Sequence, residues 1–194
     1  MKRAIFILTL GLCLLLSDGA HAQRALPAMR GLEIRGGMTD GFYTRDSRSE
    51  TGYRFGLAMS RYAKNADKWV FGAEFLNRYY PYKSERIPVA QFTAEGGYYY
   101  KFLADPSRTF FFYLGGSALA GYESVNRGER RLYDGSTLRH RDRFLYGGAV
   151  TLEIDAYLTD RIILSLTGRE RILWGTTTGH FHAQFGLGVK FIIH

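Results

Sequence analysis

Alternation between bulky apolar residues and small or polar ones is the feature that most limits what this chain can fold into. The last segment shows it best, with FHAQFGLGVKFII running from Phe181 to Ile193. Because side chains of a β-strand point alternately to opposite faces, one face of this strand would be apolar. That face would carry Phe181, Ala183, Phe185, Leu187, Val189, Phe191 and Ile193, and the opposite face His182, Gln184, Gly186, Gly188, Lys190 and Ile192. A soluble sandwich would alternate in the same way, so the remaining segments have to distinguish a soluble sandwich from a barrel in a membrane.

Eight segments of this kind follow one another along the chain. They are Gly31–Met38, Thr51–Tyr62, Lys68–Tyr80, Val89–Leu103, Arg108–Tyr122, Arg143–Tyr157, Arg161–Leu173 and Phe181–Ile193. Most are longer than the roughly six residues of an ordinary globular strand, and they approach the length of a tilted membrane-spanning strand.

The connections alternate in length. Short turns cover Ala63–Asp67, Ala104–Ser107 and Leu158–Asp160, and longer polar connections cover Thr39–Glu50, Pro81–Pro88, Glu123–Asp142 and Trp174–His180. Short turns at one end and long loops at the other are typical of outer-membrane barrels with periplasmic termini. We therefore predict an all-β fold, an eight-stranded antiparallel up-and-down β-barrel of the outer-membrane type, with extracellular long loops.

The two faces of the other segments agree with a barrel in lipid. The outward face would include Phe55, Leu57, Met59, Phe110, Phe112, Leu114, Phe144, Tyr146, Val150, Leu152 and Ile154. Aromatic residues gather near the segment ends, as in interfacial belts. We expect Tyr62, Trp69 and Tyr157 in the belt by the short turns, and Tyr79, Tyr80, Tyr82, Tyr122 and Trp174 in the belt by the long loops.

The inward face collects charges of both signs. It would carry Glu33, Arg35, Arg54, Glu74, Arg78, Glu95, Lys101, Glu153, Asp155, Arg169, Arg171 and Lys190. Because eight strands leave an interior just wide enough for side chains, these charges should pair and fill the barrel rather than line an open pore. We expect Glu153 and Asp155 to pair with Arg169 and Arg171 on the next strand.

The first residues have the features of a secretory signal peptide. Lys2 and Arg3 precede the apolar stretch Ala4–Leu16, and Ala20-His21-Ala22 supplies small residues at a cleavage site. The stretch is short for a spanning helix, which needs about 20 apolar residues. We predict a signal peptide at 1–22 and a single barrel domain at 23–194. The barrel domain contains no cysteine, and removal of the signal peptide lowers the formal charge from +8 to +7.

No pattern in the sequence marks an enzyme or a metal site. His180 and His182 would lie side by side, but a metal site needs three or four ligands. Ser124, Ser136, Asp134 and His140 all belong to one polar loop, without a nucleophile-elbow pattern. We expect no catalytic residues, no metal and no cofactor.

The most charged stretch, ESVNRGERRLYDGSTLRHRDR at 123–143, would be the longest loop. It mixes arginines with acidic residues and lacks the interleaved aromatics of a single-strand binding surface, so direct contact with nucleic acid is not expected. A solvated loop and contact with lipopolysaccharide are the plainer interpretations, and protein docking is the sharper one. The docking residues would be Arg127, Arg130, Arg131, Tyr133 and Asp134.

Four stretches resemble one known family. QRALPAMRGLE, RIPVAQFTAEGGYYY, GYESVNRGERRLYDG and GRERILWG are similar to sequences of the TraO conjugal transfer proteins, which conjugative transposons of Bacteroides and its relatives encode. The resemblance implies an accessory of a type IV secretion-like apparatus that works with other Tra proteins. It brings no catalytic residues.

Together these patterns predict a non-enzymatic outer-membrane barrel that contacts membrane lipid and has a structural or docking role in conjugative transfer. Two alternatives remain open. One is a surface exclusion or adhesion barrel that acts in recipient cells, and the other is a soluble periplasmic lipocalin-like barrel with an apolar interior.

Overall fold

The computed structural model describes residues 24–39, 52–82, 85–125, 142–176 and 180–193. Its strands are β1 (Arg30–Thr39), β2 (Gly52–Tyr62), β3 (Lys68–Tyr82), β4 (Glu85–Ala104), β5 (Phe110–Val125), β6 (Asp142–Tyr157), β7 (Ile162–Trp174) and β8 (Phe181–Ile193). One 3-10 turn, η1 (Lys64–Ala66), connects β2 to β3. Among the described residues, no helix is long and apolar enough to cross a membrane.

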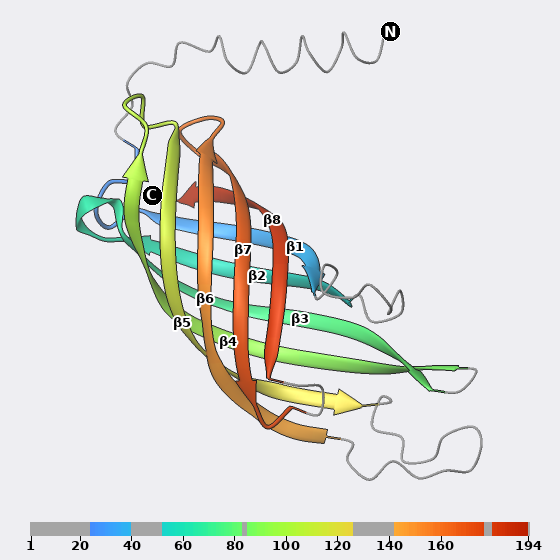
Figure 1. Ribbon diagram of the computed structural model, residues 1–194. Helices are drawn as coiled ribbons and strands as arrows, with labels where there is room; N and C mark the ends of the chain where they lie inside the picture. The colour runs from blue at the N-terminus through green and yellow to red at the C-terminus, as the bar shows by residue number, and fades with distance from the viewer. Residues whose placement is uncertain (1–23, 40–51, 83–84, 126–141, 177–179, 194) are drawn as a thin grey trace, which may run out of the picture.

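The strands close into a barrel in chain order (Figure 1). Each strand pairs antiparallel with the next, and β8 returns to pair with β1, so that Leu32 lies between Met59 of β2 and Phe191 of β8. The predicted eight-stranded up-and-down fold is therefore confirmed. We call the end with connections 63–67, 105–109 and 158–161 the turn end, and the end with connections 40–51, 83–84, 126–141 and 175–180 the loop end. β1 begins and β8 ends at the turn end.

The wall of the barrel is taller on one side. The β3–β4 hairpin continues to the pair Tyr82–Glu85, whereas β2 pairs with β3 no further than Asn77 in the described chain. Figure 1 shows this hairpin extending beyond β1 and β2 at the loop end. Two predicted boundaries were therefore wrong: most of Pro81–Pro88 belongs to strands, and β5 continues through Glu123 to Val125.

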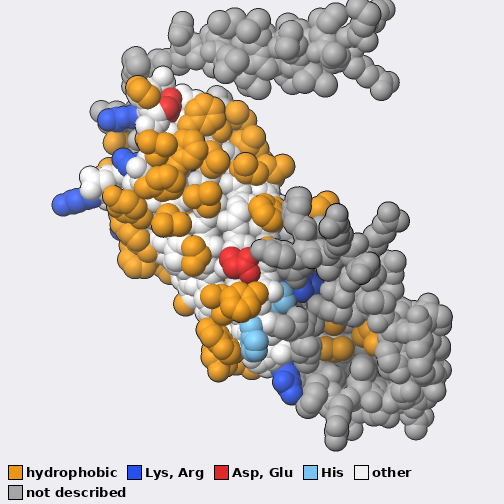
Figure 2. Space-filling view, viewed as in Figure 1, with side chains coloured by type: hydrophobic (Ala, Val, Ile, Leu, Met, Phe, Trp, Pro, Cys, Tyr) orange, Lys and Arg blue, Asp and Glu red, His pale blue; other side chains and the backbone are white. Residues whose placement is uncertain are grey.

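The outward face is apolar, as the alternation predicted. Exposed apolar residues include Leu32, Phe55, Leu57, Met59, Phe71, Leu114, Val150, Leu152, Leu166, Leu187 and Phe191. Figure 2 shows hydrophobic side chains spread over the face of the barrel in view, with basic side chains at the turn end. A broad exposed apolar surface on a closed barrel is the arrangement expected for contact with lipid tails.

The turn end of the interior is filled by aromatic rings. Tyr62 and Tyr157, which we expected in the outer belt, are buried here with Tyr99, Phe111 and Tyr113. Each has the same parity as the inward residues of its strand, so its ring enters the barrel and cannot face lipid. Trp69, Tyr122 and Trp174 are exposed on the outward face.

The segment before β1 closes the turn end. Ala25 is buried in the aromatic cluster, and the N–H of Ala28 donates to the carbonyl of Tyr62 at 2.9 Å. Arg24 pairs with Asp160 at 3.2 Å and lies 5.4 Å from the centre of the Tyr157 ring. These contacts tie the segment to the β6–β7 turn across the barrel mouth.

Candidate functional site

The charged interior is the most distinctive feature that the described residues build. Its acidic and basic side chains come from all eight strands, because alternate residues of every strand point inward. The interior has a turn half, around Lys68, Lys190, Glu153 and Asp155, and a loop half, around Glu74 and its arginines.

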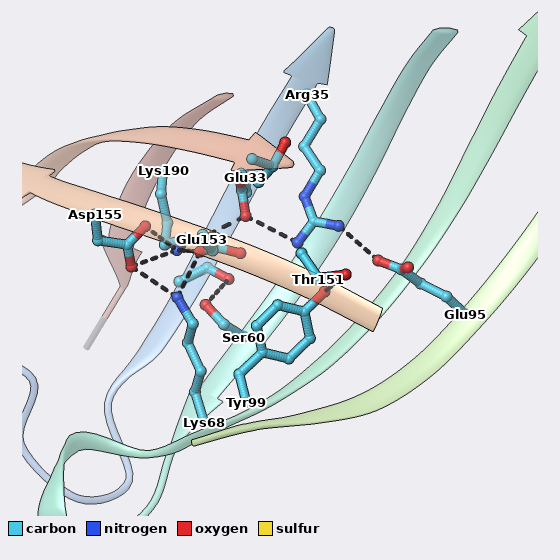
Figure 3. A network of polar contacts seen from close by, with 12 residues as sticks. Glu33, Arg35, Ser60, Lys68, Glu95, Tyr99, Thr151, Glu153, Asp155 and Lys190 are labelled. Carbon is cyan, nitrogen blue, oxygen red and sulfur yellow. Dashed lines mark hydrogen bonds and ion pairs between the residues drawn. The ribbon is translucent and has the colours of Figure 1, made fainter. Parts of the chain in front are cut away.

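In the turn half, two lysines lie between two carboxylates (Figure 3). The ammonium of Lys68 is 2.6 Å from Oε1 of Glu153 and 2.7 Å from Oδ2 of Asp155. The ammonium of Lys190 reaches the same two oxygens at 3.0 Å and 2.9 Å. All four residues are buried, and their charges cancel. Such a cluster is stable only when it is complete, since each buried charge has lost its hydration.

Aromatic rings support this cluster from the turn end. The ammonium of Lys68 lies 3.8 Å from the centre of the Tyr113 ring and 5.9 Å from the centres of the Tyr62 and Tyr99 rings. A desolvated ammonium over a ring face is stabilised by the ring quadrupole. The lysine is therefore held on one side by carboxylates and on the other by rings.

Two arginines connect the turn half to the loop half. Arg35 contacts Glu33 at 3.1 Å and Glu95 at 2.5 Å, as Figure 3 shows. Arg169 pairs with the second oxygen of Glu95 at 2.7 Å and donates to the hydroxyl of Tyr99 at 2.9 Å. The planar guanidinium suits these positions because it can serve two acceptors at once.

In the loop half, several donors share the carboxylate of Glu74. Arg54 donates to Oε2 at 2.8 Å, and Arg171 and the amide of Gln184 donate to Oε1 at 3.1 Å and 2.9 Å. Arg169 lies at the longer distance of 3.9 Å from Oε2. Positive charge therefore exceeds negative charge around Glu74.

Most predicted interior residues lie where the alternation placed them. Glu33, Arg35, Arg54, Glu74, Arg78, Glu153, Asp155, Arg169, Arg171 and Lys190 are buried. The Glu95 side chain is 6% exposed. Lys101 differs, because it is half-buried and forms no ion pair with any described residue; its backbone N–H donates to Asp67 at 2.8 Å.

The predicted pairing of Glu153 and Asp155 with the arginines of β7 was wrong. The β6–β7 register sets Glu153 opposite Thr167 and Asp155 opposite Ser165. Arg169 and Arg171 therefore lie nearer the loop end, where Glu95 and Glu74 are their partners. The carboxylates instead pair across the interior with lysines of β3 and β8.

Two charged interior residues, Lys68 and Glu123, were missed from the sequence. Lys68 has the same parity as Glu74 and could have been found from it, whereas Glu123 was assigned to a loop. Glu123 accepts from the amide of Gln91 at 2.7 Å and from the hydroxyl of Thr176 at 2.8 Å. His182, which was expected on the inward face and considered as a metal candidate, is buried there, and its Nδ1 lies 3.0 Å from Arg78.

The two histidines do not form a joint site. His182 is buried, whereas His180 is exposed and its Nδ1 lies 2.9 Å from the carbonyl oxygen of Leu173. Within the described ranges, no three His, Cys, Asp or Glu residues are grouped to hold a metal ion. Asp134, Ser136 and His140 lie outside the described residues, as do the predicted docking residues Arg127, Arg130, Arg131, Tyr133 and Asp134 and the predicted signal peptide.

One family model covers nearly all of the barrel. The model described as conjugative transposon protein TraO matches residues 26–193. The chain belongs to the TraO family. No curated protein sequence is significantly similar to this TraO-family chain.

Solved structures show the same fold at low sequence identity. Ail, the attachment invasion locus protein of Yersinia pestis, solved with the heparin analogue sucrose octasulfate, has a TM-score of 0.57 at 9% identity; the match covers 87% of this chain and 100% of Ail. Neisserial surface protein A has a TM-score of 0.54 at 14% identity, covering 84% of this chain and 95% of that protein. At these identities the likeness shows that the TraO-family barrel is of the outer-membrane type, and nothing more.

Proposed function

We propose that this chain is a non-enzymatic outer-membrane component of a conjugative DNA-transfer apparatus, with a structural or docking role. Family membership over residues 26–193 carries the link to conjugation. The described interior supports the docking role, because side chains that pair with one another occupy the space a pore would need. Because these side chains fill the described interior, they also disfavour catalysis inside the barrel.

The outward apolar face supports insertion in the outer membrane after export by the predicted signal peptide. In the proposed orientation, the turn end faces the periplasm and the loop end faces the exterior, as in outer-membrane barrels with short periplasmic turns. A lipocalin-like protein would instead have an apolar interior, and the buried ion pairs disfavour that alternative.

Docking would use the loop end, at the connection 126–141 between β5 and β6. The partner would be another protein of the transfer apparatus, contacted through Arg127, Arg130, Arg131, Tyr133 and Asp134. Replacing the three arginines with alanine should reduce transfer and remove co-purifying proteins. Alanine at Arg108 and Arg161, at the turn end, removes charge without touching the loop and serves as the control.

Deletion of the gene in a donor strain tests the proposal as a whole. Transfer frequency should fall by orders of magnitude and recover when a plasmid restores the chain. Unchanged donation, together with altered transfer into recipients that carry the chain, would instead favour the exclusion or adhesion role.

A further inference from the structure

Two arginines lie directly opposite each other on the outward face at the turn end. Arg30 of β1 is the register partner of Arg61 of β2, and both side chains are exposed. The same lateral row contains Ile193 of β8, opposite Arg30, and Trp69 of β3, opposite Arg61. The row is continuous across four neighbouring strands.

This row marks the limit of the apolar surface. The next outward residues toward the loop end are Leu32 and Met59, which are 43% and 48% exposed. Trp69 packs edge-on against Tyr98, with ring centres 5.0 Å apart. Aromatic pairs of this kind are typical of the level where lipid tails give way to headgroups.

Like charges directly opposite on paired strands repel each other, so an anion that contacts both arginines would relieve this repulsion. Neither side chain forms a hydrogen bond or ion pair with another described residue, and the described Asp side chains at this end already have partners. Asp67 accepts from the hydroxyl of Tyr98 at 2.9 Å, Asp160 pairs with Arg24 at 3.2 Å, and Asp105 accepts the N–H groups of Thr109 and Phe110, each at 2.7 Å.

We propose that Arg30 and Arg61 together bind the phosphate of a membrane phospholipid headgroup. Directly opposite residues have Cβ atoms about 5 Å apart, so two guanidinium forks can contact one phosphate. The adjoining apolar face selects a lipid over free phosphate, because the acyl chains of the same molecule would lie along Leu32 and Met59. This inference rests on the proposed membrane insertion and is independent of the role in conjugation.

The test is native mass spectrometry of the purified mature chain in a nonionic detergent, titrated with phosphatidylglycerol. The wild-type barrel should retain the lipid, and Arg30→Gln/Arg61→Gln should weaken retention roughly tenfold or more, as expected for losing charge-assisted contacts. Arg108→Gln/Arg161→Gln is the matched control, since it removes two exposed basic residues at the same end, away from the outward strand face. It should retain lipid like the wild type.

Two further ligands test whether the phosphate must be present and must belong to a lipid. Diacylglycerol, which lacks phosphate, should be retained no better by the wild type than by the Arg30/Arg61 variant, and inorganic phosphate should not displace phosphatidylglycerol. Equal retention of phosphatidylglycerol by both double variants would overturn the proposal, as would displacement by inorganic phosphate. Heat-dependent gel migration verifies folding, and Arg61→Gln alone, with a smaller expected loss, replaces the double variant if that one does not fold.

Discussion

The turn half and the loop half of the interior neutralise their buried charges in different ways. In the turn half, two lysines and two carboxylates neutralise one another above a floor of aromatic rings. In the loop half, Arg54 and Arg171 share Glu74 with the amide of Gln184. Where lysines and carboxylates are matched in number, removing one side chain leaves a buried opposite charge short of a partner. A carboxylate that several donors share, such as that of Glu74, keeps the remaining donors when one is removed. We therefore expect the turn half to contribute more than the loop half to the free energy of unfolding of the barrel.

The largest effect should come from removing a carboxylate in the turn half. Glu153→Ala would leave Lys68 with Asp155 alone, and Lys190 with Asp155 and, at 3.8 Å, Glu33. It should lower the free energy of unfolding by about 3–5 kcal/mol. Urea unfolding of the barrel in lipid vesicles measures it. Combining Glu153→Ala with Lys190→Met should recover part of the loss, and strictly additive losses would show that the two residues are not coupled.

A direct comparison of the halves uses one buried cation from each. Lys68→Met strips a partner from both Glu153 and Asp155, and should cost about 3 kcal/mol. Arg171→Met leaves Glu74 with Arg54 and Gln184, and should cost only about 1 kcal/mol. The same unfolding assay applies, and an equal or larger loss for Arg171→Met would break the distinction between the halves.

Closure of the turn end by Arg24 should contribute less to the free energy of unfolding than the interior ion pairs do. Arg24→Ala removes the pair with Asp160, a hydrogen bond to Thr109 and the contact with the Tyr157 ring. Because Asp160 is 54% exposed, the ion pair itself is weak, and the total should be about 1 kcal/mol. Protease cleavage before β1 should become faster, while Asp160→Asn alone should change it little.

The smallest effect is expected at Lys101, which was predicted to belong to the interior network. Lys101→Gln should change the free energy of unfolding by less than about 0.5 kcal/mol, as at ordinary surface positions. A loss comparable to that of Lys68→Met would mean that Lys101 pairs with the interior carboxylates after all.

Alternation and the lengths of the connections predicted the barrel and the side that most residues face, although Tyr62 and Tyr157 were expected outside and lie inside. It could not predict which charges meet, because pairing depends on the offset between strands, and that offset set Glu153 opposite Thr167 instead of an arginine. Strand ends were also hard to locate. Pro81 and Pro88 suggested a loop, but each lies where its strand has a described neighbour on one side only, and proline is tolerated there.

On this structure the barrel is closed to ions, because its interior is occupied by its own ion pairs. Single-channel recording of the purified full chain in a planar lipid bilayer tests this closure most directly. The structure predicts no conductance steps from the wild-type barrel. Regular steps whose ion selectivity changes when Glu74 or Arg171 is replaced would contradict the claim and would show that the interior conducts.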